Sequence, residues 1–162
     1  MSRAFVKEGD GALDPLPDLP LSPHPNYVTP RGLATLKARL AARQSDLAVL
    51  KSRPDRLDKL PEAAAERGIR YLEARLRTAI PVTPPHDLTE VAFGLCVTVS
   101  DHATYEITGE DEADATLHRI APQSPLARAL LGAQVGDQVI WRKPSGSVTL
   151  QILAISHADP NP

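Results

Sequence analysis

Residues 107–137 read ITGEDEADATLHRIAPQSPLARALLGAQVGD, and no other stretch of the sequence is as informative. An acidic turn over Gly109–Asp114 precedes a strand-like patch. A short helix follows, with Ser124 placed as its N-cap and Pro125 at its first position, where the missing N–H costs nothing. Because the stretch contains no nucleophile, metal cage or phosphate cradle, it predicts a shaped surface on a small β-rich domain.

Around this stretch, apolar side chains alternate with the two-residue period of β-strands. The Gly-Asp pair at 136–137 predicts a turn into another strand. With the short helix over 124–131 laid on the sheet, the pattern predicts an α+β domain with an antiparallel sheet over residues 91–157. The expected strands are residues 91–99, 102–108, 116–120, 138–143 and 147–155.

The first half of the chain has the period of a helix instead. Thr29 and Pro30 are placed as N-cap and first residue of one helix, and Pro61 opens a second. A break at Ser52–Asp55 separates them, because proline cannot continue a helix interior. Residues 27–80 therefore predict an antiparallel helical hairpin with a coiled-coil seam. The seam residues are Leu33, Leu36, Leu40, Leu47, Leu50, Ala65, Ile69, Leu72, Leu76 and Ala79.

Prolines mark the remaining segments. The chain has 16 prolines, and those in residues 1–26 predict an extended arm. This arm is either a disordered tail or a segment that packs along its own protein or along a partner. Residues 81–90 are expected to link the hairpin to the sheet domain, and residues 158–162 to form a short tail.

Composition limits the classes of function. The formal net charge of −2 argues against a protein that binds nucleic acid through bulk phosphate neutralisation. The single Cys96 excludes an intramolecular disulfide and a cysteine-rich zinc site. No segment approaches the ~20 apolar residues that span a bilayer, and the N-terminus lacks a signal-peptide core, so a soluble cytoplasmic protein is expected. The five histidines lack metal-ligand spacing, and no cofactor is expected.

Motifs in both halves resemble the Gre family of bacterial transcript-cleavage factors. Residues 27–33 (YVTPRGL) are similar to the start of the family's hairpin, and residues 91–94 (VAFG) to its first C-terminal strand. Residues 107–114 (ITGEDEAD) and 124–132 (SPLARALLG) are close to the family's two most distinctive motifs. The opening MSRAFVKE and the segment SPHPNYVTP resemble a proteobacterial subgroup of Gre-like proteins.

The resemblance implies a fold, a partner and a mode of action. The C-terminal domain would have the FKBP-like fold and dock at the rim of the secondary channel of bacterial RNA polymerase, with the hairpin pointing into the channel. In cleavage-competent members, acidic residues at the hairpin tip help to hold a second Mg²⁺ at the polymerase active site, a role that suits oxygen ligands. Catalysis would belong to the polymerase. This chain is therefore expected to be no enzyme, to have no catalytic residues, and to contact nucleic acid only through polymerase.

The hairpin tip departs from the family pattern. The family's acidic tip motif is absent, and residues 55–62 read DRLDKLPE instead. Both helices are expected to be about two turns, or roughly 11 Å, shorter than in full-length members. This length resembles the short-hairpin branch of the family, first described as regulating nucleoside diphosphate kinase. We therefore expect a monomeric, polymerase-binding regulator of elongation that stimulates transcript cleavage little.

Two groups of residues are candidates for functional contacts. Asp55 and Asp58 are weak candidates for holding a metal, against a solvated loop whose basic residues neutralise them. Two other functions stay open: a true cleavage-stimulating factor that uses these carboxylates, and an interaction module for a protein other than polymerase. The acidic turn could equally be solvated, but the resemblance favours a contact. The residues expected to bind the partner are Asp111, Glu112, Asp114, Ser124, Pro125 and Arg128.

Overall fold

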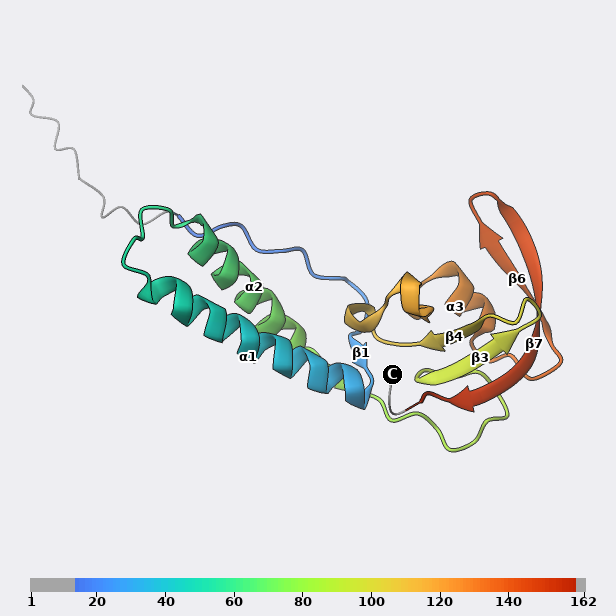
Figure 1. Cartoon of the computed structure of the whole chain (residues 1–162). Coiled ribbons are helices and arrows are strands. Elements are labelled where there is room, and N and C mark those ends of the chain that lie inside the picture. Colours follow the sequence, from blue (N-terminus) through green and yellow to red (C-terminus); the bar gives the residue numbers. More distant parts are fainter. Residues whose placement is uncertain (1–13, 160–162) are drawn as a thin grey trace, which may run out of the picture.

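The computed structural model describes residues 14–159. A helical hairpin and a small sheet domain lie end to end and give the molecule an elongated shape (Figure 1). Residues 1–13 of the predicted arm and residues 160–162 of the predicted tail lie outside the described residues. Within residues 14–159, no helix is both long and apolar enough to cross a membrane.

The hairpin consists of α1 (Pro30–Ser52) and α2 (Leu60–Arg77), which confirm the two predicted helices. Thr29 caps α1, because its hydroxyl accepts a hydrogen bond from the N–H of Gly32 at 2.9 Å. The second helix begins one residue before Pro61, which therefore lies in its first turn, as expected for proline.

Among residues 14–159, large apolar side chains between the two helices are fully buried only near the sheet domain. Leu36 and Leu72 are buried there together with Val28. Farther along the hairpin, the seam residues Leu47 and Leu50 are only half-buried. Along the predicted coiled-coil seam, the leucines are therefore buried at the base of the hairpin, and toward the tip they are half-buried beside the small buried residue Ala65.

A short parallel strand pair closes the base of the hairpin. β1 (Tyr27–Val28) pairs with β2 (Ile80–Pro81), with Tyr27 opposite Ile80. The sequence pattern does not predict this pairing, because two-residue strands leave no period to detect. The pair brings the chain into and out of the hairpin side by side.

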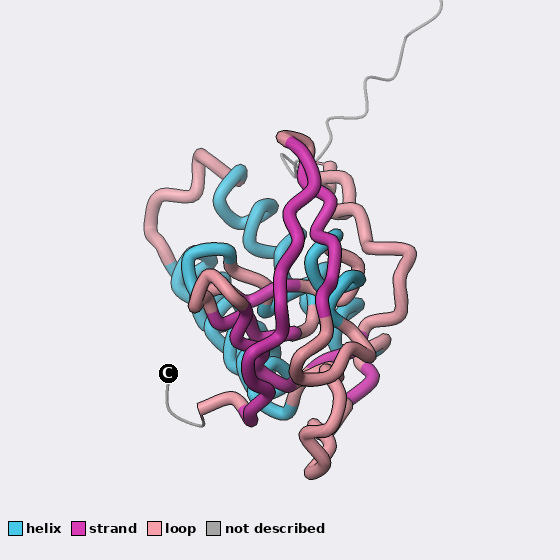
Figure 2. Tube along the Cα trace, turned by 90° about the vertical axis from the view of Figure 1, so that its right-hand side faces the viewer, coloured by secondary structure: helices cyan, strands magenta, loops and turns pink. Residues whose placement is uncertain are grey.

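The sheet domain contains one five-stranded sheet with the strand order β5-β4-β3-β7-β6. The β4–β5 pair is parallel and the other pairs are antiparallel, so the expectation of a wholly antiparallel sheet is wrong at β5. In Figure 2, β6 and β7 run side by side as a long two-stranded ribbon. The strands are β3 (Leu95–Val99), β4 (Thr104–Ile107), β5 (Arg119–Ile120), β6 (Gln138–Lys143) and β7 (Gly146–His157).

Three strands, predicted over residues 91–99, 102–108 and 116–120, are shorter in the structure than the alternating pattern predicts. Residues 91–94 turn before β3 begins, with Gly94 at φ +83°, a conformation that favours glycine. Residues 115–117 form a 3-10 turn, η2 (Ala115–Leu117), because the Asp114 carboxylate accepts the N–H of Thr116 at 2.8 Å. Alternation alone does not distinguish such turns from a strand.

The helix α3 (Pro125–Leu130) lies on the sheet and confirms the predicted short helix with Ser124 as its N-cap. Its residues Leu126 and Leu130 point into the core of the domain. Pro125 and Arg128 are exposed on its other side. The strand residues of the core are Leu95, Val97, Val99, Ile107, Val139, Leu150, Ile152 and Ile155.

Candidate functional site

The acidic turn predicted over Gly109–Asp114 contains a 3-10 turn, η1 (Glu110–Glu112). This turn follows β4 and contacts β1 and α1, so the sheet domain meets the hairpin here (Figure 1). We call this contact the domain joint. It is made by Asn26, Thr29, Arg31, Tyr71, Arg75, Glu106, Glu110, Asp111, Glu112 and Arg119.

Glu112 binds the first turn of α1. One of its oxygens accepts the Thr29 hydroxyl at 2.5 Å, and the other accepts the backbone N–H groups of Thr29 and Gly109, each at 3.2 Å. A negative charge at this end of a helix is also favoured by the helix dipole. Because the Glu112 side chain is only 7% exposed, these bonds replace water that it would otherwise bind.

Asp111 binds two side chains of α2. It accepts hydrogen bonds from Arg75 Nε at 2.6 Å and from the Tyr71 hydroxyl at 2.9 Å. Arg75, whose side chain is 3% exposed, also donates to Asn26 Oδ1 at 2.6 Å. Burial raises the pKa of Tyr71, and its hydrogen bond to Asp111 raises it further, so the hydroxyl stays protonated and donates.

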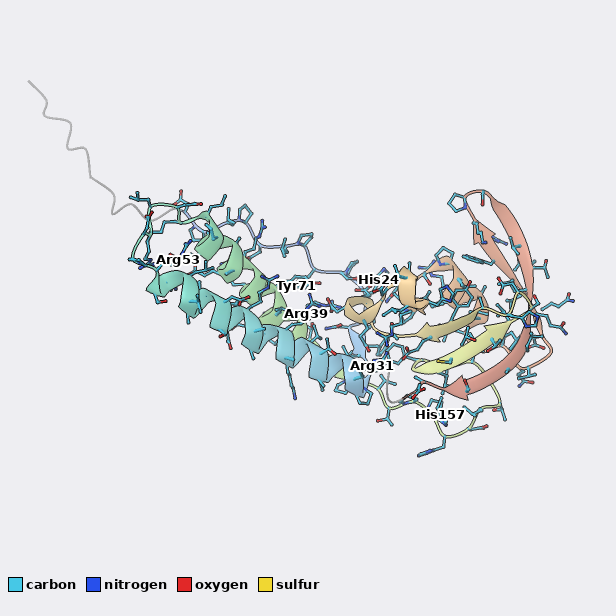
Figure 3. All side chains as sticks on the ribbon, viewed as in Figure 1. His24, Arg31, Arg39, Arg53, Tyr71 and His157 are labelled. Atoms are coloured by element: carbon cyan, nitrogen blue, oxygen red, sulfur yellow. The ribbon has the colours of Figure 1, made fainter. Side chains whose placement is uncertain are left out.

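Arg31 connects α1 to the sheet itself. Its guanidinium lies at the base of the hairpin (Figure 3), 2.7 Å from one oxygen of Glu106 on β4 and 3.7 Å from Glu112. The other oxygen of Glu106 accepts Arg119 Nε at 3.2 Å from β5. Charges of alternating sign therefore run from α1 across two strands.

These contacts correct the expectation of an exposed acidic surface. Asp111 and Glu112 point into the domain joint, whereas Asp114 is exposed and caps η2. Hydrogen bonds from Thr116 hold the pKa of Asp114 below its usual range. A partner contact through any of the three carboxylates stays a prediction. The partners of Asp111 and Glu112 in the joint lie on distant segments of the chain. Arg75, for example, is 36 residues away from Asp111, and no local sequence motif indicates such a partner.

The other predicted contact residues lie together on α3. The Ser124 hydroxyl accepts the N–H of Ala127 at 3.2 Å, so this side chain caps the helix. Pro125 and Arg128 are exposed beside it. The structure thus places Ser124, Pro125 and Arg128 together, as the N-cap and exposed residues of one short helix.

An apolar cavity adjoins this helix, and the sequence pattern does not predict it. The cavity has a volume of ≈ 320 Å³ and is lined by Tyr105, His118, Trp141, Ser124 and Pro125, among others. The Tyr105 ring lies 5.2 Å from the His118 ring and 6.3 Å from the Trp141 ring, between centroids. The three rings lie on separate segments of the chain, so no regular spacing in the sequence indicates that they meet.

The hairpin tip is a loop held by its own carboxylates. Asp55 accepts the N–H of Leu57 at 3.1 Å, and Asp58 accepts the N–H of Leu60 at 2.9 Å. Leu57 itself is 94% exposed at the turn. Among residues 14–159, no three His, Cys, Asp or Glu side chains lie close enough together to hold a metal ion.

The fold and its contacts define a class of protein. It is a two-part α+β protein in which a small sheet domain holds the base of a helical hairpin, while the hairpin tip and one side of α3 are exposed. Residues 85–157 match the family described as "Transcription elongation factor, GreA/GreB, C-term". Over this segment the chain is similar to the C-terminal domain of the GreA/GreB transcription elongation factors.

Individual relatives match over part of their length. GreA of Pseudomonas putida is 35% identical over 104 residues, which cover 59% of this chain and 64% of that protein. GreA of Francisella philomiragia is 40% identical over 99 residues, covering 57% and 62%. The crystal structure of Gfh1, a GreA factor homolog of Thermus thermophilus, matches at 22% identity and a TM-score of 0.37, over 82% of this chain and 99% of that one. The chain thus spans less than two thirds of the two GreA proteins.

Proposed function

We propose that the protein binds bacterial RNA polymerase and regulates transcription elongation, as a monomer in the cytoplasm and without catalysing a reaction itself. The match of residues 85–157 to the GreA/GreB C-terminal family carries this proposal. Both GreA relatives are named transcription elongation factors. In this proposal the C-terminal domain is FKBP-like and docks at the rim of the polymerase secondary channel, and the hairpin enters that channel.

The α3 surface has the chemistry of a docking site. An apolar cavity with aromatic walls can take an apolar side chain, and Arg128, which is exposed about one helical turn beyond the cavity residues Ser124 and Pro125, can pair with a carboxylate. Aromatic and arginine side chains carry most of the binding energy in protein interfaces. The partner surface we infer is therefore a polymerase segment with an apolar side chain beside an acidic one.

Reversing the charge of Arg128 is expected to weaken polymerase binding. An interface arginine is worth about 2 kcal/mol, so Arg128→Glu should raise the Kd about 30-fold or more. The Kd can be measured by titrating fluorescently labelled protein with core polymerase. Arg142→Glu is the matched control, because Arg142 is exposed on β6 and neighbouring strand residues point to opposite faces, away from Trp141. Equal Kd values for the two variants would remove α3 from the docking site.

We further propose that the hairpin stimulates transcript cleavage only weakly. In Asp55 and in Asp58, one carboxylate oxygen already accepts a hydrogen bond from a backbone N–H group at the tip. Leu57 protrudes between them as an apolar side chain, which is no metal ligand. Arg56 pairs with Glu62 at 2.6 Å, which holds the pKa of Glu62 below its usual range and occupies the third acid near the tip.

Backtracked elongation complexes provide the test. Adding this protein should leave the transcripts at their full length over a period in which a cleavage-stimulating GreA, used as positive control, shortens them. Shortening that is lost in Asp55→Asn with Asp58→Asn would instead establish the cleavage-factor alternative, because a second metal needs these oxygens. Failure to bind polymerase, with co-purification of another protein, would favour the interaction-module alternative.

A further inference from the structure

We propose that the outer face of α2 is a binding site for an extended, proline-rich segment, and that residues 14–25 of the chain occupy it as a strap that stabilises the far half of the hairpin. These residues run alongside α2 without regular secondary structure (Figure 1). Of the two readings that the prolines left open, the structure favours the arm that packs on its own protein. This role is independent of polymerase binding.

The centre of the site is Arg70 on α2. Its Nε donates to the Asp18 carboxylate at 2.6 Å, and its Nη2 donates to the backbone carbonyl of Leu16 at 2.7 Å. The Arg70 side chain thus binds both a negative charge and an extended stretch of backbone in the strap. Next to it, Leu19 and Leu21 line a cavity of ≈ 340 Å³ together with Tyr71 and Ala74.

The other end of the strap is tied to the domain joint. The Ser22 hydroxyl donates to the Glu110 carboxylate at 2.9 Å, across the boundary to the sheet domain. The Asn26 amide then donates to the backbone carbonyl of Arg75 at 2.7 Å and to Thr78 Oγ1 at 3.2 Å. The strap therefore spans from the middle of α2 to the acidic turn.

The far half of the hairpin lacks a core of its own. Its buried side chains on α2 include Ala63 and Ala65, which are small, and Gly68 has no side chain at all. Small residues bury little apolar area, and glycine weakens a helix by roughly 1 kcal/mol relative to alanine. Leu19 of the strap lines a second cavity of ≈ 670 Å³ beside these residues, so the strap adds apolar surface where α2 is weakest. Its prolines also limit the freedom that is lost when it binds.

Hydrogen exchange of the full-length chain tests the strap. Asp18→Arg should open the strap by placing two positive charges together, and the amides of Leu60–Arg70 should then exchange about five-fold faster. Asp14→Arg is the matched control, because Asp14 is exposed on the same segment and makes no hydrogen bond or ion pair within residues 14–159. Exchange that is equally fast in the two variants, or unchanged in both, would overturn the proposal.

A charge swap separates the strap from the helix itself. Arg70→Asp is expected to accelerate exchange partly because aspartate is a poorer helix former than arginine. Combining it with Asp18→Arg restores an ion pair of opposite sense without changing α2 further. Exchange in the double variant should therefore be slower than in Arg70→Asp alone, and exchange as fast or faster would contradict the assigned contact.

Discussion

Replacing Arg75 with methionine should lower the free energy of unfolding by about 3–5 kcal/mol, the loss that follows when one partner of a buried ion pair is removed. Methionine has a similar length and keeps the apolar contacts of the side chain. What it removes is the charge and the donors that bind Asp111 and Asn26. The domain joint then contains the Asp111 carboxylate, which is 9% exposed and, within residues 14–159, retains only the Tyr71 hydroxyl as a partner.

Because it is buried, the Arg75–Asp111 ion pair is expected to contribute more to stability than an exposed ion pair does. Lys51 and Glu66 also lie 2.9 Å apart, but their side chains are 47% and 41% exposed. Exposed pairs of that kind contribute about 0–1 kcal/mol, because water and salt screen them and water solvates either partner when the other is lost. Arg75 is 3% exposed, so no solvent replaces it.

Urea unfolding followed by circular dichroism measures the loss. Arg77→Met is the control, since Arg77 is exposed on the same helix and makes no ion pair within residues 14–159. It should change the stability by less than about 0.5 kcal/mol. Arg75→Met combined with Asp111→Leu should recover most of the loss, because the unpaired carboxylate is gone. A cost below about 1 kcal/mol for Arg75→Met alone would mean that water reaches the joint.

Helices were predictable from the sequence because their signals are local. Thr29 with Pro30, and Ser124 with Pro125, mark helix starts within two adjacent residues, and the structure places N-caps at Thr29 and Ser124. The predicted strand over 116–120 is wrong in its first part, where residues 115–117 form a 3-10 turn. The side chain that caps this turn belongs to Asp114, a residue that the alternating pattern ignores. Local signals thus gave the elements but not every boundary.

The site was harder to predict than the fold. Ser124 and Arg128 were placed near each other because they share one short helix. Asp111 and Glu112 were expected to contact a partner because the resemblance to the Gre family favours such a contact. Their burial depends on Arg75 and Thr29, which only the folded chain brings near. The acidic turn itself contains no basic residue, and this was the available sign that the partners of Asp111 and Glu112 lie elsewhere.

Gly32→Ala should lower stability by about 2 kcal/mol, although alanine is the better helix former by about 1 kcal/mol. Gly32 lies in the first turn of α1, and a Cβ there would overlap the carboxyl group of Glu112. Glu112 can move only by giving up hydrogen bonds to Thr29 and Gly109. Bonds to a charged group are worth about 1.5–3 kcal/mol each, so partial loss outweighs the gain in helix propensity.

The same substitution at Gly68 should have the opposite sign. A Cβ at Gly68 would meet no described atom within 4 Å, so Gly68→Ala should raise stability by about 0.5–1 kcal/mol in the same urea experiment. Adding Glu112→Ala to Gly32→Ala removes the overlap, and the two losses should then sum to more than the double variant costs. If Gly32→Ala stabilised the chain as Gly68→Ala does, the Glu112 carboxylate would not rest on the first turn of α1, and Arg31 would be the contact that remains between α1 and the sheet domain.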